Sequence, residues 1–146
     1  MRWDPGPIIR VTGTAQPQGS TKAFMPKGGR FPVVTSDNPK LKGWRSLIAH
    51  EAQQAAQGWY AFEAAVRVVI MVTLPRPKAI RATQPPHTKK PDIDKLARGI
   101  FDALTGVVWR DDSQVVELHI NKHYALAGEA PGIVVTLFSL ENETDG

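Results

Sequence analysis

The sequence predicts a single α+β domain, in which two main helices cover a mixed β-sheet of about four to five strands. Two observations lead to this prediction. Apolar residues recur at helical spacing in two segments of the chain, and runs rich in β-branched residues lie before, between and after them. The expected order is β(β)αβαββ, with no repeat and no linker that would separate two domains.

The N-terminal part contains one clear strand signal and one weak one. Residues 7–13 (PIIRVTG) alternate between apolar and polar and are bounded by Pro and Gly, which predicts a strand. Residues 14–31 are rich in Gly, Pro and Lys and predict a loop. The VVT run at 33–35 predicts at most a short strand after it.

The first helix is expected to begin after Asp37 or Asn38, because either side chain is a good helix cap. Apolar residues then recur at helical spacing as far as Ala55. The helix is expected to extend to about Gln57, since Gly58 can end it there.

A strand and a long loop are expected next. Residues 64–74 (AAVRVVIMVTL) are nearly all apolar and β-branched, which predicts a central strand buried on both faces. Residues 75–91 are rich in Pro and in basic side chains and predict a loop. Long loops in compact domains are more often functional than idle, so this loop is a candidate part of a site.

The second helix has the best-defined pattern, a continuous apolar stripe. The stripe consists of Ile93, Leu96, Ala97, Ile100, Phe101 and Leu104. Gly106 stands where the helix is expected to end. Two further strands are predicted at Val115–Tyr124 and Gly132–Leu140, and Trp109 is expected in the core.

Composition excludes several classes of protein and site. The chain contains no cysteine, which excludes disulfides, thiolate zinc sites and cysteine nucleophiles. It has no apolar run of about 18 residues and no signal-peptide core, so we expect no membrane span. The absence of cysteine is consistent with a cytoplasmic protein.

The charge is unevenly distributed. All 18 basic residues and ten of the 14 acidic ones lie at or before Lys122, which gives that part a net charge of +8. We expect a basic domain at residues 1–140 and an acidic tail at 141–146. A basic body is consistent with a polyanionic partner, although a soluble basic protein without one fits the charge equally well.

Two aspartates at the start of the second helix are candidate metal ligands. If residues 92–94 are extended, the side chains of Asp92 and Asp94 face the same way, roughly 7 Å apart. Carboxylate oxygens at that spacing suit a hydrated Mg²⁺ ion. Aspartate at a helix start is also a common cap, and spacing leaves both interpretations open.

Three further charged residues follow. Asp111 and Asp112 lie in a turn, where aspartate is common, and spacing does not determine whether Asp112 returns to the start of the helix. Arg98 stands four residues after Asp94, which favours a surface ion pair over a role in stabilising phosphate charge. Glu117, two strand positions before His119, is a further candidate acid, although an exposed strand residue is the favoured interpretation.

Basic side chains in the loops predicted at 14–31 and 75–91 are candidate contacts for the DNA backbone. Such contacts require positive charge and do not require recognition of the base sequence. They are Lys22, Lys27, Arg30, Arg76, Lys78, Arg81, Lys89 and Lys90.

The stretch KKPDIDKLARGIFDALTGVVWRDDSQVVELHINK resembles the RusA family of Holliday junction resolvases. The matching pattern is D-x-D, DAL and DD-x-Q-V, and it covers Pro91–Lys122. PQGSTKAF at 17–24 and LKGWR at 41–45 also resemble phage-type members, so most of the chain is covered.

The resemblance implies a homodimer that nicks four-way DNA junctions symmetrically with Mg²⁺ or Mn²⁺, in recombination or repair. It also implies that the protein acts in the cytoplasm of a bacterial or phage-infected cell. The family's metal-binding carboxylates correspond to Asp92, Asp94 and Asp112. Its catalytic lysine corresponds to Arg98, which keeps the charge but cannot give up a proton, and its asparagine corresponds to Lys95. Lys95 is therefore a candidate replacement for the lysine.

The sequence thus predicts a crossover junction endodeoxyribonuclease with catalytic residues Asp92, Asp94, Asp112, Arg98 and Lys95. Two alternatives stay open. One is a less selective nuclease that cuts flaps and other branched DNA. The other is a junction-binding protein without catalysis. This alternative rests on Lys95 and Arg98, which differ from the family's asparagine and catalytic lysine.

Overall fold

The computed structural model describes residues 2–19, 21–25, 27–31, 33–36, 38–80 and 85–141. Asp37, Arg81 and the tail at 142–146 lie outside these residues, as do the side chains of 21–24 and 33–36. None of the helices in the described part is long and apolar enough to cross a membrane.

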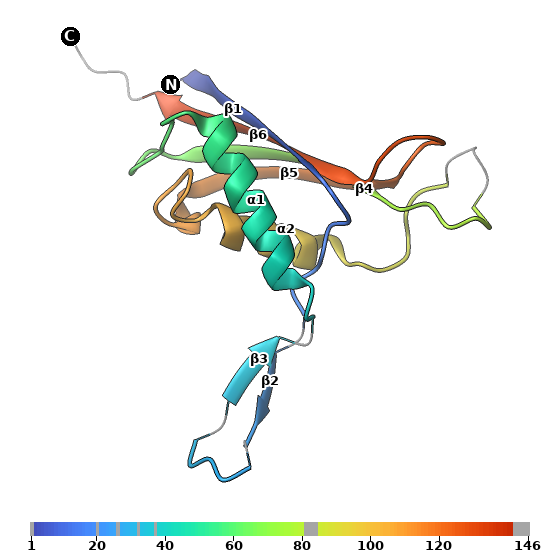
Figure 1. The fold of residues 1–146 in the computed structure, drawn as a ribbon. Helices are drawn as coiled ribbons and strands as arrows, with labels where there is room; N and C mark the ends of the chain where they lie inside the picture. Colours follow the sequence, from blue (N-terminus) through green and yellow to red (C-terminus); the bar gives the residue numbers. More distant parts are fainter. Residues whose placement is uncertain are drawn as a thin grey trace.

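A four-stranded mixed sheet forms the centre of the molecule (Figure 1). Its strands are β1 (Arg2–Thr12), β4 (Val66–Leu74), β5 (Val115–Tyr124) and β6 (Gly132–Glu141), in the spatial order β1-β6-β4-β5. The β4 and β5 strands are parallel, whereas β6 is antiparallel to both of its neighbours. The α+β class and the mixed sheet are confirmed.

The two helices explain which side of the sheet is buried. Both α1 (Leu41–Ala56) and α2 (Ile93–Leu104) pack on one face of the sheet and against each other (Figure 1). The core between them contains fully buried Ile48, Leu96 and Ile100. The predicted Trp109 is confirmed in this core, with its Nε1 donating to Oγ1 of Thr105 at 2.9 Å.

The central strand differs from the prediction of burial on both faces. In β4 the residues at 66, 68, 70, 72 and 74 are buried, while those between them are not. Met71 is 47% exposed. The prediction was wrong because no helix of the described part covers the second face of the sheet, so the β4 side chains on that face are half-buried or exposed.

The N-terminal part contains more strand than predicted. The first strand begins at Arg2 instead of residue 7, because Pro5 and Pro7 lie in an edge strand, where a missing N–H is tolerated. The predicted loop at 14–31 contains β2 (Thr21–Phe24), which pairs with β3 (Val33–Ser36). This two-stranded hairpin projects away from the sheet and helices (Figure 1).

The first helix is shorter than predicted at its start. Asn38 does not cap it directly, because its Oδ1 accepts from the N–H of Lys40 before the helix begins at Leu41. At the other end Gln57 adopts the left-handed conformation, with φ 48°, and Gly58 follows with φ 88°. The expected end of the helix at these two residues is confirmed.

Candidate functional site

The segment before α2 is fixed to the end of β5. Nζ of Lys122 donates hydrogen bonds to the carbonyl oxygens of Lys89 at 2.7 Å and Pro91 at 2.8 Å. The ring of His87 lies 4.2 Å from the ring of Tyr124, centre to centre. The start of α2 therefore lies beside the end of β5.

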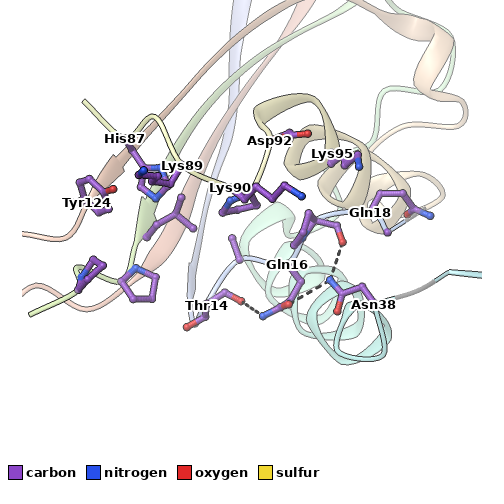
Figure 2. A pocket seen from close by; sticks show the side chains of 17 residues that line it. Thr14, Gln16, Gln18, Asn38, His87, Lys89, Lys90, Asp92, Lys95 and Tyr124 are labelled. Atoms are coloured by element: carbon purple, nitrogen blue, oxygen red, sulfur yellow. Dashed lines mark hydrogen bonds between the residues drawn. The ribbon is translucent and has the colours of Figure 1, made fainter. Parts of the chain in front are cut away.

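An open pocket of about 690 Å³ lies at this junction (Figure 2). Asp92 and Lys95, from the start of α2, lie on one side of it, and His87 lies with Tyr124 on another. Lys89 and Lys90 also line the pocket, so its lining contains three lysines and one aspartate. Such a pocket attracts a polyanion.

The other wall of the pocket comes from the N-terminal loop. The N–H of Gln18 donates to the carbonyl oxygen of Lys95 at 3.0 Å, which attaches this loop to the first turn of α2. Nδ2 of Asn38 donates to the carbonyl oxygen of Pro17 at 2.8 Å and lies 3.3 Å from Oε1 of Gln16 (Figure 2). Segments that are distant in sequence therefore form one pocket.

Two polar atoms of pocket residues are buried without a hydrogen-bond partner among the described residues. They are Nδ1 of His87 and Oε1 of Gln18. Burial lowers the pKa of His87 below its ordinary value, so the neutral ring is favoured. A buried polar atom without a partner is costly, and a bound ligand or water would satisfy it.

The side chains of Asp92 and Asp94 do not lie on the same side of an extended segment, as the sequence analysis had supposed. Asp92 is extended, with φ −70° and ψ 139°, but the helix begins at Ile93, so Asp94 belongs to the first helical turn. Successive helical residues are rotated by about 100°, so the two side chains point in different directions. Only Asp92 lines the pocket. Residues 92–94 are therefore not extended throughout, and the predicted spacing of roughly 7 Å between the two carboxylates does not apply.

Asp112 lies at the far end of the sheet from Asp92. It opens the short 3-10 helix η1 (Asp112–Gln114), directly before β5 begins. The chain from 105 to 114 turns at the end of the sheet opposite to the start of α2 (Figure 1). Val115 and Lys122 are separated by about 23 Å at the rise of an extended strand.

The turn that contains Asp112 is held by Gln114. Its Oε1 accepts from the N–H groups of Arg110 and Asp111, both at 2.9 Å. Its Nε2 donates to the carbonyl oxygens of Ala61 at 2.9 Å and Ala64 at 3.0 Å. Asp111 caps η1, and the hydrogen bond from the N–H of Ser113 lowers the pKa of its carboxyl group.

The three predicted metal ligands therefore do not meet within one chain. No group of three carboxylate or imidazole side chains in the described part is arranged to hold a metal ion. Asp92, Asp94 and Asp112 as one site stay a prediction, and this single chain does not fit it.

The predicted cations occupy different environments. Lys95 is half-buried and lines the pocket together with Asp92. Arg98 is exposed, does not line the pocket, and forms no ion pair with Asp94, although both residues are described. The interpretation of Arg98 as the partner of Asp94 was wrong. The two side chains share a helix face but extend separately into solvent.

The predicted DNA contacts are distributed over three places. Lys89 and Lys90 line the pocket, and Lys78 is exposed in the loop after β4. Lys27 and Arg30 are exposed in the turn between β2 and β3. Arg76 is half-buried, with a buried Nη1 that has no partner among the described residues. Arg81 and the side chain of Lys22 lie outside the described part.

The sequence assigned no structural role to His87 and Lys122 beside the pocket, or to Gln114 in the turn of Asp112. Each acts by binding the backbone or a ring of a distant segment, and such contacts leave no periodic pattern. Glu117 was read as an exposed strand residue, but it is half-buried. Its Oε1 lies 2.9 Å from Nε2 of His119 and 3.6 Å from Nε of Arg67, and the hydrogen bond with His119 lowers its pKa.

Comparison with known proteins agrees with the sequence resemblance. The family described as Endodeoxyribonuclease RusA matches residues 10–137. A protein described as "Uncharacterized protein YqaN", from Bacillus subtilis (strain 168), is 42% identical over 50 residues, which cover 34% of this chain and 33% of YqaN. The matched segment thus spans about a third of that relative. Because the family match covers most of the chain, this protein belongs to the RusA endodeoxyribonuclease family.

Proposed function

We propose that the protein is a crossover junction endodeoxyribonuclease, which cuts four-way DNA junctions during recombination or repair in the cytoplasm. Family membership over residues 10–137 is the observation that carries this proposal. The pocket at the start of α2 supports it, because it combines a carboxylate with ammonium groups on an open surface. DNA backbone binding requires such a basic surface.

In this proposal the pocket receives the DNA strand that is cut. Lys89 and Lys90 bind phosphates that flank the scissile one, and the ammonium group of Lys95 stabilises the charge that develops on the reacting phosphate. Lys95 is the better candidate than Arg98 because it lies in the same pocket as Asp92. The exposed cations of the hairpin tip contact a second DNA arm.

Dependence on Mg²⁺ or Mn²⁺ is part of the proposal. Hard divalent ions prefer oxygen ligands, and the aspartates at 92, 94 and 112 supply them. A bound ion would lower the pKa of its water and stabilise the leaving oxygen. A single chain separates these aspartates, so the complete site requires more than one chain.

The test is cleavage of a labelled synthetic four-way junction in the presence of Mg²⁺ or Mn²⁺. We expect the wild-type protein to nick the junction and the Asp94→Asn variant to lose this activity. Asp4→Asn is a matched control, because Asp4 pairs with Arg2 on the distant strand β1. Equal cutting by wild type and Asp94→Asn would contradict the proposal.

Competition with linear duplex and with flap DNA distinguishes the alternatives. A junction resolvase prefers the four-way junction, whereas a less selective nuclease cuts flaps and junctions at similar rates. Binding of the junction without cleavage in either metal would identify a binding protein that lacks catalysis.

A further inference from the structure

Two exposed aromatic side chains lie close together in the segment between α1 and β4. Tyr60 is 40% exposed and Phe62 is 61% exposed, and the centres of their rings are 6.2 Å apart. Among the described residues, Phe31 is the one other large aromatic side chain that is exposed, and it lies in the turn between β2 and β3. Aromatic side chains usually contribute their large apolar area to a core, so two that face solvent together are candidates for binding.

A cation accompanies the two rings. The guanidinium carbon of Arg110 lies over the ring of Phe62, 5.2 Å from its centre. The side chain of Arg110 is 62% exposed, and its ion pair with Glu63 is long, at 4.0 Å. The planar guanidinium group has five donors, so it can bind a phosphate while it lies over the ring. Aromatic rings beside a cation are the groups with which proteins bind single-stranded DNA, because the rings stack on bases and the cation binds the backbone.

The aromatic segment is fixed to the turn that carries Asp112. The N–H of the buried Ala61 donates to the carbonyl oxygen of Val108 at 2.9 Å. Nε2 of Gln114 donates to the carbonyl oxygens of Ala61 at 2.9 Å and Ala64 at 3.0 Å. The parallel strands β4 and β5 begin directly after these two segments, at the same end of the sheet (Figure 1). The two rings are therefore held in place before a ligand binds, which lowers the entropic cost of binding.

We propose that Tyr60, Phe62 and Arg110 form a base platform, on which an unpaired base of the bound DNA stacks. The base lies on the aromatic rings, and Arg110 binds a phosphate next to it. This inference rests on the proposed function, in which DNA is the substrate. A base stacks on a side chain only after it has left its own helix, so the base platform favours the branch point over the paired arms. The strand that binds here lies beside Asp112, a candidate metal ligand.

The surroundings of the base platform suit a nucleotide better than a protein partner. Glu63 and Asp111, which follow Phe62 and Arg110 in the chain, are both exposed and charged. A stable protein interface buries about 800 Å² on each side around an apolar centre, and two rings among charged side chains do not provide such a centre. A single base needs only one aromatic face.

Binding of two matched single strands tests the base platform without depending on cleavage. One is a fluorescent oligothymidine strand, and the other is a strand of the same length that has the same phosphates and no bases. In fluorescence anisotropy without divalent metal, we expect wild type to bind oligothymidine about tenfold more tightly than the strand without bases. The double variant Tyr60→Leu with Phe62→Leu should bind the two strands equally, because leucine keeps apolar area and has no aromatic face.

Further variants separate stacking from charge and from folding. Phe62→Trp should keep the preference for oligothymidine, since it keeps an aromatic face. Arg110→Gln should weaken the binding of both strands equally and reduce the salt dependence by about 0.7 units of slope. Leu126→Ala, at an exposed position after β5, is the control and should change neither value. Circular dichroism is expected to be unchanged throughout, because the substituted side chains are exposed.

Photocrosslinking locates the base on the protein. A four-way junction with 5-iodouracil at the strand exchange is expected to crosslink to Tyr60 or Phe62, as mass spectrometry of the peptides would show. Crosslinks that all lie outside residues 60–62 would overturn the base platform, as would an unchanged preference for oligothymidine in the double variant, even if wild type cuts junctions. Loss of the preference in the double variant would support the base platform even if wild type cuts no DNA.

Discussion

Nζ of Lys122 lies 2.8 Å from the carbonyl oxygen of Pro91, and this hydrogen bond joins the end of β5 to the entrance of α2. The same ammonium group binds the carbonyl oxygen of Lys89 at 2.7 Å. One side chain thus holds the segment that carries the pocket lysines and Asp92.

Replacing Lys122 with Met should loosen the start of α2. The two carbonyl oxygens lose a charged donor, which is expected to lower the free energy of unfolding by about 1 to 2 kcal/mol. Junction cleavage should fall more than stability alone explains, because Asp92 loses its fixed position. Urea unfolding and cleavage rates measure both effects. Lys78→Met, at an exposed position, is the control, and equal behaviour of the two variants would contradict the role of Lys122.

Replacing Gln114 with Leu should disturb the turn that carries Asp112. Its amide makes four hydrogen bonds to the backbone. The substitution leaves the part-buried carbonyl oxygens of Ala61 and Ala64 without this donor. We expect the free energy of unfolding to fall by at least about 2 kcal/mol, as measured by urea unfolding. A loss below about 0.5 kcal/mol, within the range of ordinary surface substitutions, would show that these bonds do not hold the turn.

Stability should depend on pH through His87. Burial lowers the pKa of His87 below its ordinary 6.5, so the unfolded chain takes up a proton more readily than the folded one. The stabilisation that results is complete above about pH 6.5 and is lost as the pH falls through the lowered pKa. His87→Phe keeps a ring beside Tyr124 but does not titrate, so its melting temperature should change less between pH 8 and pH 5. An identical change in wild type and variant would exclude this role.

The two candidate cations should differ in their contribution to cleavage. Lys95→Ala is expected to lower the single-turnover cleavage rate by about 100-fold, because Lys95 lies in the pocket of Asp92. Arg98→Ala should lower it much less, since Arg98 is exposed outside the pocket. Larger loss from Arg98→Ala would assign the catalytic cation to the position of the family's lysine instead.

The pocket lysines should contribute to binding through phosphates alone. Replacing Lys89 and Lys90 with Gln is expected to weaken junction binding equally for all sequences and to reduce the salt dependence by about one unit of slope per lost contact. Titrations at several salt concentrations measure this slope. A loss that depends on the sequence at the crossover would indicate base reading.

The sequence predicted α2 and β5 at their observed bounds, because both have uninterrupted patterns that end at glycine or at a turn. It missed the first five residues of β1, because Pro5 and Pro7 normally indicate that a strand has not yet begun. Proline is tolerated here because β1 lies at the edge of the sheet, which the sequence does not show. It also assigned β4 two buried faces, because an apolar run does not show which face a helix covers.

The site was predictable only in part, because the sequence shows which residues are close along the chain but not which distant segments meet. The aspartates and the pocket lysines stand close together in sequence, so their local grouping at the start of α2 was visible. The place of Asp112 depends on the path of the chain, because β5 returns along α2 and leaves Asp112 at the opposite end. Spacing in sequence contains no information about that return.

The most direct test of the central claim is single-turnover cleavage of a four-way junction by wild type and by Asp92→Asn, with binding measured for both. Asp92 lines the pocket together with Lys95 and with Lys89 and Lys90 of the preceding segment. We predict that Asp92→Asn binds the junction as tightly as wild type and cuts it at least about 100-fold more slowly. Cleavage by Asp92→Asn at the wild-type rate would contradict the assignment of this pocket as the nuclease site.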